Sequence, residues 1–300
     1  ATDILKAAVL MLAPTILMGI SFPLGCRVVT ESSATVGRNV GRAYALNLLG
    51  SVAGPLVTGF VLLPRLGSEG VLYAMVTASL VTGLFLVVLF SSTRGRILVR
   101  MIPVAAVLLL GYVRTMRPNL VLQLLNTGGE PVVYFKEESS GSLVATQLKD
   151  GVHLIVGGSV GAGSTPMYQR TDELLAYIPL LLHPSPRQVA VICFGTGRTT
   201  GLFAQHPAVE SVDVVEIAQG AFDAGRDLFG SFNMNVLSNP KVRPVLDDGF
   251  NFLKYSPDRY DVISIDPFTP RDPGSARLYT RDFLQFAKAR LNTGGVVVMW

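Results

Sequence analysis

The sequence predicts two kinds of structure in one chain: an α-helical transmembrane region, followed by a parallel α/β domain that begins with a small β subdomain. Two observations lead to this prediction. Apolar residues make up 49% of the 300 residues and charged residues only 15%, whereas a soluble domain carries about 25% charged residues. The apolar excess lies in the first third of the chain, and strand-like and helix-like segments alternate after residue 171. The composition excludes a disordered chain, a collagen-like chain and a purely cytosolic enzyme.

Long apolar stretches make up the first part of the chain. The stretches without any charge are residues 7–26, 43–64 and 70–93. Each is long enough to cross the hydrocarbon core as a helix, which takes about 20 residues. A fourth stretch, residues 97–113, contains Arg100 and spans only if that side chain snorkels to the interface. We therefore expect a transmembrane region of three or four spans over residues 1–113, and a connector over residues 114–130.

One face of the second stretch carries small and polar residues. Asn47, Gly50, Gly54 and Thr58 recur at helical spacing. A GxxxG pattern lets a neighbouring helix approach closely, and an asparagine can hydrogen-bond across the interface. Packing within one helical bundle is the simpler interpretation. Contact with partners in a membrane complex is the alternative.

The next segment, residues 131–170, is typical of a small β subdomain. Short β-like runs cover residues 132–135, 143–148 and 152–156. Between the last two runs, Lys149, Asp150 and Gly151 form a hairpin turn signal. Residues 157–165 are rich in glycine and serine, and we expect them to form a loop.

Residues 171–300 alternate between strands and helices. The predicted strands are residues 188–194, 211–217, 242–245, 260–265 and 295–300. The predicted helices are residues 171–182, a helix opened by residues 195–201, then 218–229, 250–255 and 280–291. This order predicts a parallel, doubly wound sheet. The chain begins without a methionine and ends inside a strand-like run, so we expect a longer protein and an α/β domain that is incomplete at its C-terminal end.

The ends of the first two strands carry residues typical of nucleoside binding. Gly195 and Gly197 follow the first strand and permit a tight turn with close backbone approach. Glu216 follows 19 residues later at the end of the second strand, where a carboxylate binds a ribose diol in dinucleotide folds. The alternatives are a glycine turn with a purely structural role and a solvated Glu216.

Acidic residues also end the third and fourth strands. Asp247 and Asp248 follow the third strand and could accept a hydrogen bond from the exocyclic amine of a purine, or one of them could cap the helix that begins at Phe250. Asp266 follows the fourth strand and is either part of the same site or a turn residue before Pro267. Ligands of such sheets bind beyond the carboxyl ends of the strands.

The neighbouring motifs indicate the type of ligand. The sequence has no GxxxxGK[ST] motif, and the third glycine of a GxGxxG pattern falls one place late, at Gly201. Several acids without an arginine clamp favour a cationic ligand over a pyrophosphate, and S-adenosylmethionine and its decarboxylated form are such ligands. The spacing of Cys26 and Cys193 favours buried packing residues over a metal site.

Charge placement argues against nucleic-acid binding. Residues 1–130 have a net charge of +6 and residues 131–300 of −2. The positive charge thus accompanies the apolar stretches, where arginines mark cytoplasmic loops. The arginines of the two loops expected to be cytoplasmic are Arg27, Arg38, Arg42, Arg94, Arg96 and Arg100.

A set of motifs relates the chain to a known family. The motifs are residues 18–24 and 41–67 in the apolar part and, in the remainder, 178–184, 195–197, 215–216, 247–249, 260–263 with Asp266, and 278–280. On these motifs the chain resembles the polyamine aminopropyltransferases (spermidine synthases). It is most similar to bacterial membrane proteins that fuse a transporter-like helical region to a spermidine-synthase-like domain.

The resemblance implies a Rossmann-like, class I methyltransferase-type domain preceded by a small β-hairpin subdomain. It implies that Gly195 and Gly197 line the nucleoside site, that Glu216 holds the ribose, and that Asp248 neighbours the adenine. Asp266 would match the acid that orients and deprotonates the attacking amine. The implied donor is S-adenosylmethionine or decarboxylated S-adenosylmethionine, with no metal.

The implied acceptor site departs from the family pattern. The family's Tyr-His-Glu run falls on Thr171, Asp172 and Glu173, so only Glu173 retains the family residue. The family's second acid, three residues after the catalytic one, falls on Thr269. Glu173 and Thr269 thus mark the expected substrate positions, and the acceptor is unknown.

Three functions follow from these patterns. The first is a membrane-anchored transferase that moves an aminopropyl or methyl group from a sulfonium donor to an unknown acceptor. The second is a non-catalytic membrane scaffold subunit of a larger complex, and the third is transport through the helical region. We expect a multi-pass protein of the bacterial inner membrane. Because sulfonium donors are made in the cytosol, we expect its soluble half to be cytoplasmic, with residues 97–113 not crossing the bilayer.

Overall fold

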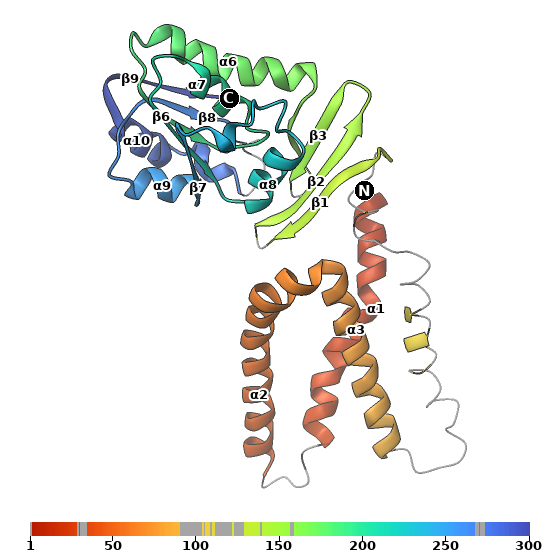
Figure 1. Cartoon of the computed structure of the whole chain (residues 1–300). Helices are drawn as coiled ribbons and strands as arrows, with labels where there is room; N and C mark the ends of the chain where they lie inside the picture. The colour runs from red at the N-terminus through yellow and green to blue at the C-terminus, as the bar shows by residue number, and fades with distance from the viewer. Residues whose placement is uncertain are drawn as a thin grey trace. The chain divides into compact units, whose positions relative to one another are not determined.

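The computed structural model describes most of the chain (Figure 1). The described residues are 2–28, 30, 35–90, 104, 106–108, 110–111, 122, 129–138, 140–156, 159–267, 270 and 274–300. They divide into two compact units, Ala1–Leu62 and Leu63–Trp300. The predicted fourth span and the connector, residues 97–130, lie almost entirely outside the described residues.

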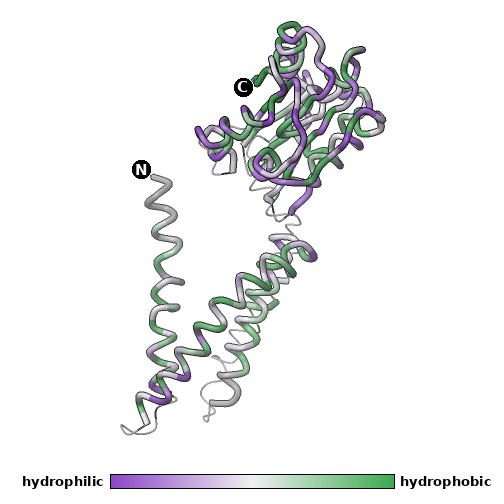
Figure 2. The backbone as a smooth tube through the Cα atoms, turned by 90° about the vertical axis from the view of Figure 1, so that its left-hand side faces the viewer, coloured by the Kyte–Doolittle hydropathy of each residue, from purple (hydrophilic) through white to green (hydrophobic). Residues whose placement is uncertain are grey.

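The first unit is helical and exposes apolar side chains. It contains α1 (Thr2–Val28), α2 (Val36–Val57) and a π-helical turn at Thr58–Leu62. Leu46 on α2 is 70% exposed and Phe60 in the π-helical turn is 74% exposed, which in water would be unfavourable for so many large apolar residues. Figure 2 shows the hydrophobic character of these helices.

Length and composition single out fewer spans than the sequence predicted. Within the described residues, one helical run, Val36–Phe85, is long and apolar enough to cross a membrane, and the apolar part of α1 is shorter, Thr15–Val28. Membrane insertion of this region therefore stays a prediction.

The second unit begins with α3 (Leu63–Phe90), which bends at one glycine. Gly67 has φ +67° and ψ 172°, a conformation that favours glycine. The helix resumes at Ser68, whose backbone N–H donates to Glu137 Oε2 at 2.7 Å. Glu137 thus caps the second part of α3 from a strand far along the sequence.

The β subdomain is a four-stranded antiparallel sheet in the order β1-β2-β3-β4. Its strands are β1 (Val132–Glu138), β2 (Gly141–Leu148), β3 (Gly151–Val156) and β4 (Ser159–Gly163). The prediction of a loop over residues 157–165 was wrong, because β4 pairs with β3 there, Val160 opposite Ile155. Its glycines serve close packing: a Cβ added to Gly163 would lie 2.7 Å from the Val152 carbonyl oxygen.

The α/β domain is built on a five-stranded parallel sheet in the order β7-β6-β5-β8-β9. Its elements are α6 (Pro166–Leu182), β5 (Gln188–Ile192), α7 (Arg198–Gln205), β6 (Ser211–Glu216), α8 (Gln219–Asp227), a 3₁₀ turn (Val236–Ser238), β7 (Val242–Leu246), α9 (Gly249–Tyr255), β8 (Tyr260–Ile265), a 3₁₀ turn (Ala276–Tyr279), α10 (Arg281–Ala289) and β9 (Leu291–Met299). The predicted doubly wound sheet is confirmed. Helix α6 begins five residues earlier than predicted, because Pro166 suits the first helical position.

Two hydrophobic cores cover the two faces of this sheet. Successive residues of β5 alternate between them: Val189 and Val191 belong to one core, Ala190 and Ile192 to the other. Helices α6, α7 and α8 contribute to the first core, and α9 and α10 to the second. The chain moves from β5 outward to β7, then returns to place β8 on the other side of β5. The ends of β5 and β8 therefore flank a topological switch point, where ligands bind in such folds.

Candidate functional site

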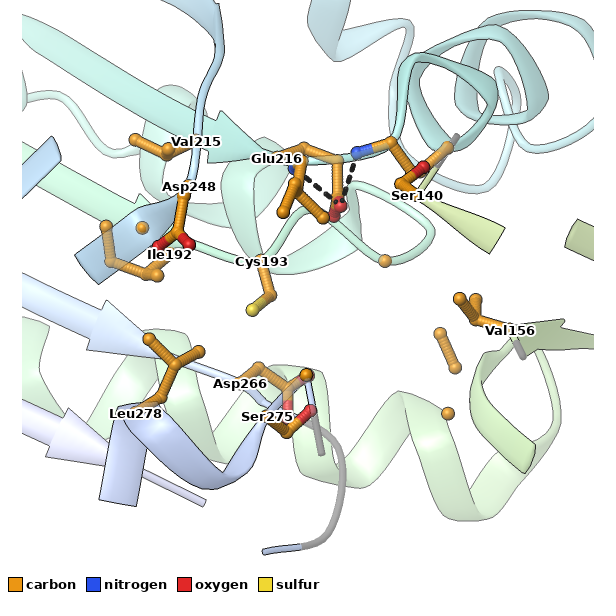
Figure 3. Close-up of a pocket in the computed structure, with 18 of the residues that line it drawn as sticks. Ser140, Val156, Ile192, Cys193, Val215, Glu216, Asp248, Asp266, Ser275 and Leu278 are labelled. Carbon is orange, nitrogen blue, oxygen red and sulfur yellow. Dashed lines mark hydrogen bonds between the residues drawn. The ribbon is translucent and has the colours of Figure 1, made fainter. Parts of the chain in front are cut away.

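A cavity of about 300 Å³ lies at this switch point (Figure 3). The β subdomain contributes Ser140, Val156 and Ala162 to its lining, and the α/β domain contributes the ends of β5, β6 and β8. Its size is at the lower end of the range for small-molecule sites. Four sequence-predicted residues meet here: Gly195, Glu216, Asp248 and Asp266.

The two predicted glycines have different roles. Gly195 lines the cavity with φ +56°. Gly197 has φ +86° and is not among the lining residues, and a Cβ added there would lie 2.4 Å from Cζ of Phe194. Gly197 is therefore needed for packing of the Phe194 ring and for the left-handed turn into α7.

Glu216 ends β6 with its carboxylate held by the backbone. Oε2 accepts from the Phe194 N–H at 2.9 Å. Oε1 accepts from the N–H groups of Ile217 at 2.9 Å and Ala218 at 3.1 Å, and Figure 3 draws hydrogen bonds of this carboxylate as dashed lines. Burial raises the pKa of Glu216, and the backbone hydrogen bonds oppose this rise. The side chain is thus fixed in place before any ligand arrives.

The adjacent acids Asp247 and Asp248 separate in the structure. Asp248 lines the cavity and also caps α9, because its Oδ1 accepts from the Phe250 N–H at 2.7 Å. Asp247 is not among the lining residues, and its Oδ1 accepts from the Asp248 N–H at 2.8 Å. The nucleoside-side role predicted for the pair therefore falls on Asp248.

The sequence analysis missed an arginine at this site. Arg277 lines the cavity, its Nη1 lies 3.1 Å from Asp248 Oδ2, and its guanidinium lies over the Phe250 ring at 4.5 Å. The expected absence of an arginine was wrong, although Asp248 balances its charge. Its only sequence signal was its place beside the motif at residues 278–280.

Asp266 follows β8 and faces the cavity (Figure 3). Its N–H donates to the Ile192 carbonyl oxygen at 3.1 Å, which continues the strand pairing and fixes the backbone at this end. Burial raises the pKa of Asp266 to about 7. Asp266 can therefore exchange a proton near neutral pH.

Cys193 is a second residue that the sequence analysis did not place in the site. It lines the cavity directly after β5 with φ +73°, which is uncommon for a residue with a side chain. Burial, and then the charges of Glu216, Asp266 and Asp248, raise the pKa of its thiol, so the thiol is neutral. Its position at the end of a central strand was the available signal.

Of the two predicted acceptor-side residues, only Glu173 is described, and it does not line the cavity. Glu173 Oε1 pairs with Arg198 Nη2 at 2.8 Å and is not among the lining residues. Thr269 lies outside the described residues. Asp172, one residue before Glu173, accepts from Thr199 Oγ1 at 3.1 Å. Burial, followed by the charge of Asp266, raises the pKa of Asp172 to about 7.

Among the described residues, no group of three or more histidine, cysteine, aspartate or glutamate side chains is arranged to hold a metal ion.

Comparison with known families shows what this domain is similar to. Residues 168–300 match the model of the spermine/spermidine synthase domain. The spermidine synthase of Dictyostelium discoideum is 32% identical over 162 residues, which cover 54% of this chain and 56% of that protein. The polyamine aminopropyltransferase of Mycobacterium tuberculosis is 25% identical over 284 residues, 89% of this chain and 52% of that protein. The chain spans about half the length of the curated relatives it matches.

Solved structures show the same fold. A spermidine synthase in complex with the transition state analogue AdoDATO has a TM-score of 0.52 at 24% identity, covering 56% of this chain and 57% of that one. The spermidine synthase of Thermotoga maritima has a TM-score of 0.50 at 24% identity, covering 56% of each chain. The fold thus defines a Rossmann-like, class I methyltransferase-type domain. The family model and the relatives support the spermidine synthase/polyamine aminopropyltransferase family for it, and the solved structures show the shared fold.

Proposed function

We propose that this protein is a membrane-anchored transferase that moves the aminopropyl group of decarboxylated S-adenosylmethionine to an acceptor amine. The observation that carries the proposal is the cavity at the switch point, where Glu216, Asp248 and Asp266 come together from three strand ends. The match of residues 168–300 to the spermine/spermidine synthase domain supports the same chemistry. Methyl transfer from S-adenosylmethionine is the alternative reaction at this site.

The lining suits a nucleoside with a positive centre. The fixed carboxylate of Glu216 would accept hydrogen bonds from ribose hydroxyls. Apolar side chains at the strand ends, Ile192 and Val215, and Leu278 beside them would contact the base. Asp266, when ionised, would place negative charge near a sulfonium and contribute to binding of the cation.

The proposed step needs a base for the acceptor. The amine nitrogen attacks the propyl carbon beside the sulfonium, forming a C–N bond while the C–S bond breaks. The electron pair of that bond stays on sulfur, which becomes a neutral thioether, and the nitrogen loses one proton. Asp266 would receive this proton, since a carboxylate with a pKa of about 7 is a base suited to neutral pH. Orientation of the amine by the same group adds to the rate.

The membrane attachment is part of the proposal. The apolar helical run Val36–Phe85 supports it. The alignment with the Mycobacterium tuberculosis relative also supports it, because an alignment over 89% of this chain includes much of the helical part as well as the α/β domain. We place the protein in the bacterial inner membrane with the α/β domain in the cytoplasm, where the donor is made. Protease treatment of sealed inverted vesicles should cleave the α/β domain, and its protection would contradict this placement.

The small-residue face of α2 is the proposed contact with other membrane helices. A Cβ added to Gly50 or Gly54 meets no atom within 4 Å among the described residues. Asn47 lies on the same face, so a helix of this chain or of a membrane partner could approach closely. Cross-linking from a cysteine placed at Gly50 would identify the neighbour, and labelling by lipid alone would contradict the proposal.

One experiment tests the transferase. The full chain in detergent is given decarboxylated S-adenosylmethionine or S-adenosylmethionine with a pool of small amines, and products are identified by mass spectrometry. We expect 5′-methylthioadenosine with the decarboxylated donor, whereas S-adenosylhomocysteine would indicate methyl transfer. Calorimetry with each donor runs in parallel. Binding without either product would favour the non-catalytic scaffold, and the absence of binding would overturn nucleoside recognition altogether.

A further inference from the structure

The buried carboxylate of Asp172 has no role in the site as described so far. One of its oxygens, Oδ1, accepts from Thr199 Oγ1 at 3.1 Å. The other, Oδ2, is buried and has no hydrogen-bond partner among the described residues. A buried acceptor without a partner is costly. Such a group is retained where a proton or another group shares the site.

The packing of α6 brings Asp172 to the edge of the sheet where Asp266 lies. Because α6 connects to β5 through residues 183–187 only, it runs antiparallel to β5 and to the parallel strand β8. Its N-terminal half therefore lies at the carboxyl edge of the sheet. The hydroxyl of Ser264 donates to the Leu175 carbonyl oxygen at 3.4 Å and sets the register between the two elements.

The positions of the two acids can be inferred from this hydrogen bond. Asp266 is two residues beyond Ser264 and so lies on the same side of β8. Asp172 is three residues before Leu175 and so lies on the same side of α6. The hydrogen bond to Thr199, at the start of α7, independently puts Asp172 at this edge of the sheet.

We propose that Asp172 is a positioning residue of this site, and that Asp172 and Asp266 act as one pair of acids that shares a proton during the transfer. This inference rests on the proposed function for its catalytic part. Two neighbouring carboxyls with little access to water cannot both ionise freely. The charge of Asp266 raises the pKa of Asp172, and the pair is expected to lose its two protons in coupled steps. Asp172 thereby makes Asp266 a stronger base toward the acceptor amine without touching it.

Other titratable or charged groups interact with the pair from the elements packed around it. They are Tyr168 and Glu173 on α6, Arg198 on α7, Cys193 after β5 and Tyr279 in the 3₁₀ turn before α10. The Arg198 guanidinium lowers the pKa of Asp172, although Arg198 is itself paired with Glu173. The like charge of Asp266 has the larger effect, after burial.

The test of the catalytic part is the pH dependence of transfer by the full chain. With Asp266 as base, the rate rises with pH as the carboxyl ionises. Asp172→Asn keeps an acceptor for Thr199 but removes the charge, so the midpoint of this rise should move to lower pH by about half a unit or more. Glu210→Gln, which removes an exposed charge paired with Arg187, should leave the midpoint unchanged. A rate lowered equally at every pH, with the midpoint unmoved, would mean that Asp172 is only structural.

A second measurement needs no transfer activity. Thermal unfolding of the full chain in detergent is followed at pH 8 for Asp172→Asn, Asp266→Asn and the double variant. Each single change removes the repulsion between the acids, so the increase in Tm of the double variant should be smaller than the sum of the two single increases. Additive increases would overturn the pair. If no donor is turned over by the wild type but the increases are not additive, the proposed function fails and the pair stands.

Discussion

Two acids of this molecule, Glu216 and Asp172, stand near the same cavity and are stabilised in opposite ways. Glu216 is on the donor wall, which we define as Gly195, Glu216 and Asp248, and its carboxylate accepts from three backbone N–H groups. Asp172 and Asp266 form the acid wall, where Asp172 Oδ2 has no partner in the described part of the chain. On the donor wall, backbone N–H groups stabilise the negative charge of Glu216. On the acid wall, a bound proton must neutralise the negative charge instead.

The largest effect should come from the acid wall. Asp266→Asn keeps the shape of the side chain but removes the base, so the rate of transfer should fall by about 10²–10⁴-fold. Donor affinity should fall far less than the rate, because Glu216 and Asp248 still hold the nucleoside. Rates of 5′-methylthioadenosine formation and calorimetry with the donor measure the two quantities. Undiminished transfer would make Asp266 a turn residue.

The next effect should come from the donor wall and should fall on binding. Glu216→Gln replaces an acceptor of three backbone hydrogen bonds by an amide that must turn N–H groups toward them, and the ribose loses a charged acceptor. Hydrogen bonds to charged groups contribute about 1.5–3 kcal/mol, so donor affinity should fall by about 10–100-fold. Calorimetry measures it. An unchanged affinity would mean that the nucleoside binds elsewhere.

The glycine turn offers a stability test with a matched control. Gly197→Ala forces a side chain into φ +86° and into the Phe194 ring, at a total cost of about 2–5 kcal/mol. Gly294→Ala has a similar φ of +80° but meets no atom within 4 Å, so it should cost about 1–2 kcal/mol. Denaturant unfolding gives both values. Equal losses would show that backbone strain alone matters at Gly197.

The smallest expected effect is on donor affinity, and it distinguishes the charge of Arg277 from its packing. Arg277 lies beside Asp248 with its side chain 54% exposed, and it repels a cationic donor only weakly through water. Arg277→Gln should therefore raise affinity for decarboxylated S-adenosylmethionine by no more than about fivefold, while neutral 5′-methylthioadenosine should bind as before. An equal change for both ligands would point to packing against Phe250 instead.

Much of the sheet was predictable because parallel strands are buried on both faces. Gln188–Ile192 and Tyr260–Ile265 are short apolar runs bounded by turn residues, a pattern that few other structures produce. Glu216, Asp248 and Asp266 could be grouped in advance because parallel strands present their carboxyl ends at one edge.

The remainder depended on contacts between distant segments. The glycines of β4 concealed the strand in the sequence pattern. At Gly163 a side chain would clash with the Val152 carbonyl oxygen. The nearness of Asp172 to Asp266 depends on the register that Ser264 sets with Leu175. The residues next to either acid in the sequence do not indicate this register. The capping role of Asp248 was foreseen as an alternative, and its coexistence with a cavity position was not.

The contacts of strand β1 determine where the chain can be truncated. Glu137 reaches Ser68 after the bend in α3, while its neighbour Lys136 reaches Asp223 on α8 at 2.6 Å, because successive side chains of a strand point to opposite faces. A water-soluble fragment beginning at residue 129 would give up the Ser68 hydrogen bond and keep the Lys136 ion pair. One beginning after β1 would also lose the Lys136 ion pair to α8, the helix that contributes Ala221 to the cavity. The useful boundary for crystallisation therefore lies ahead of β1.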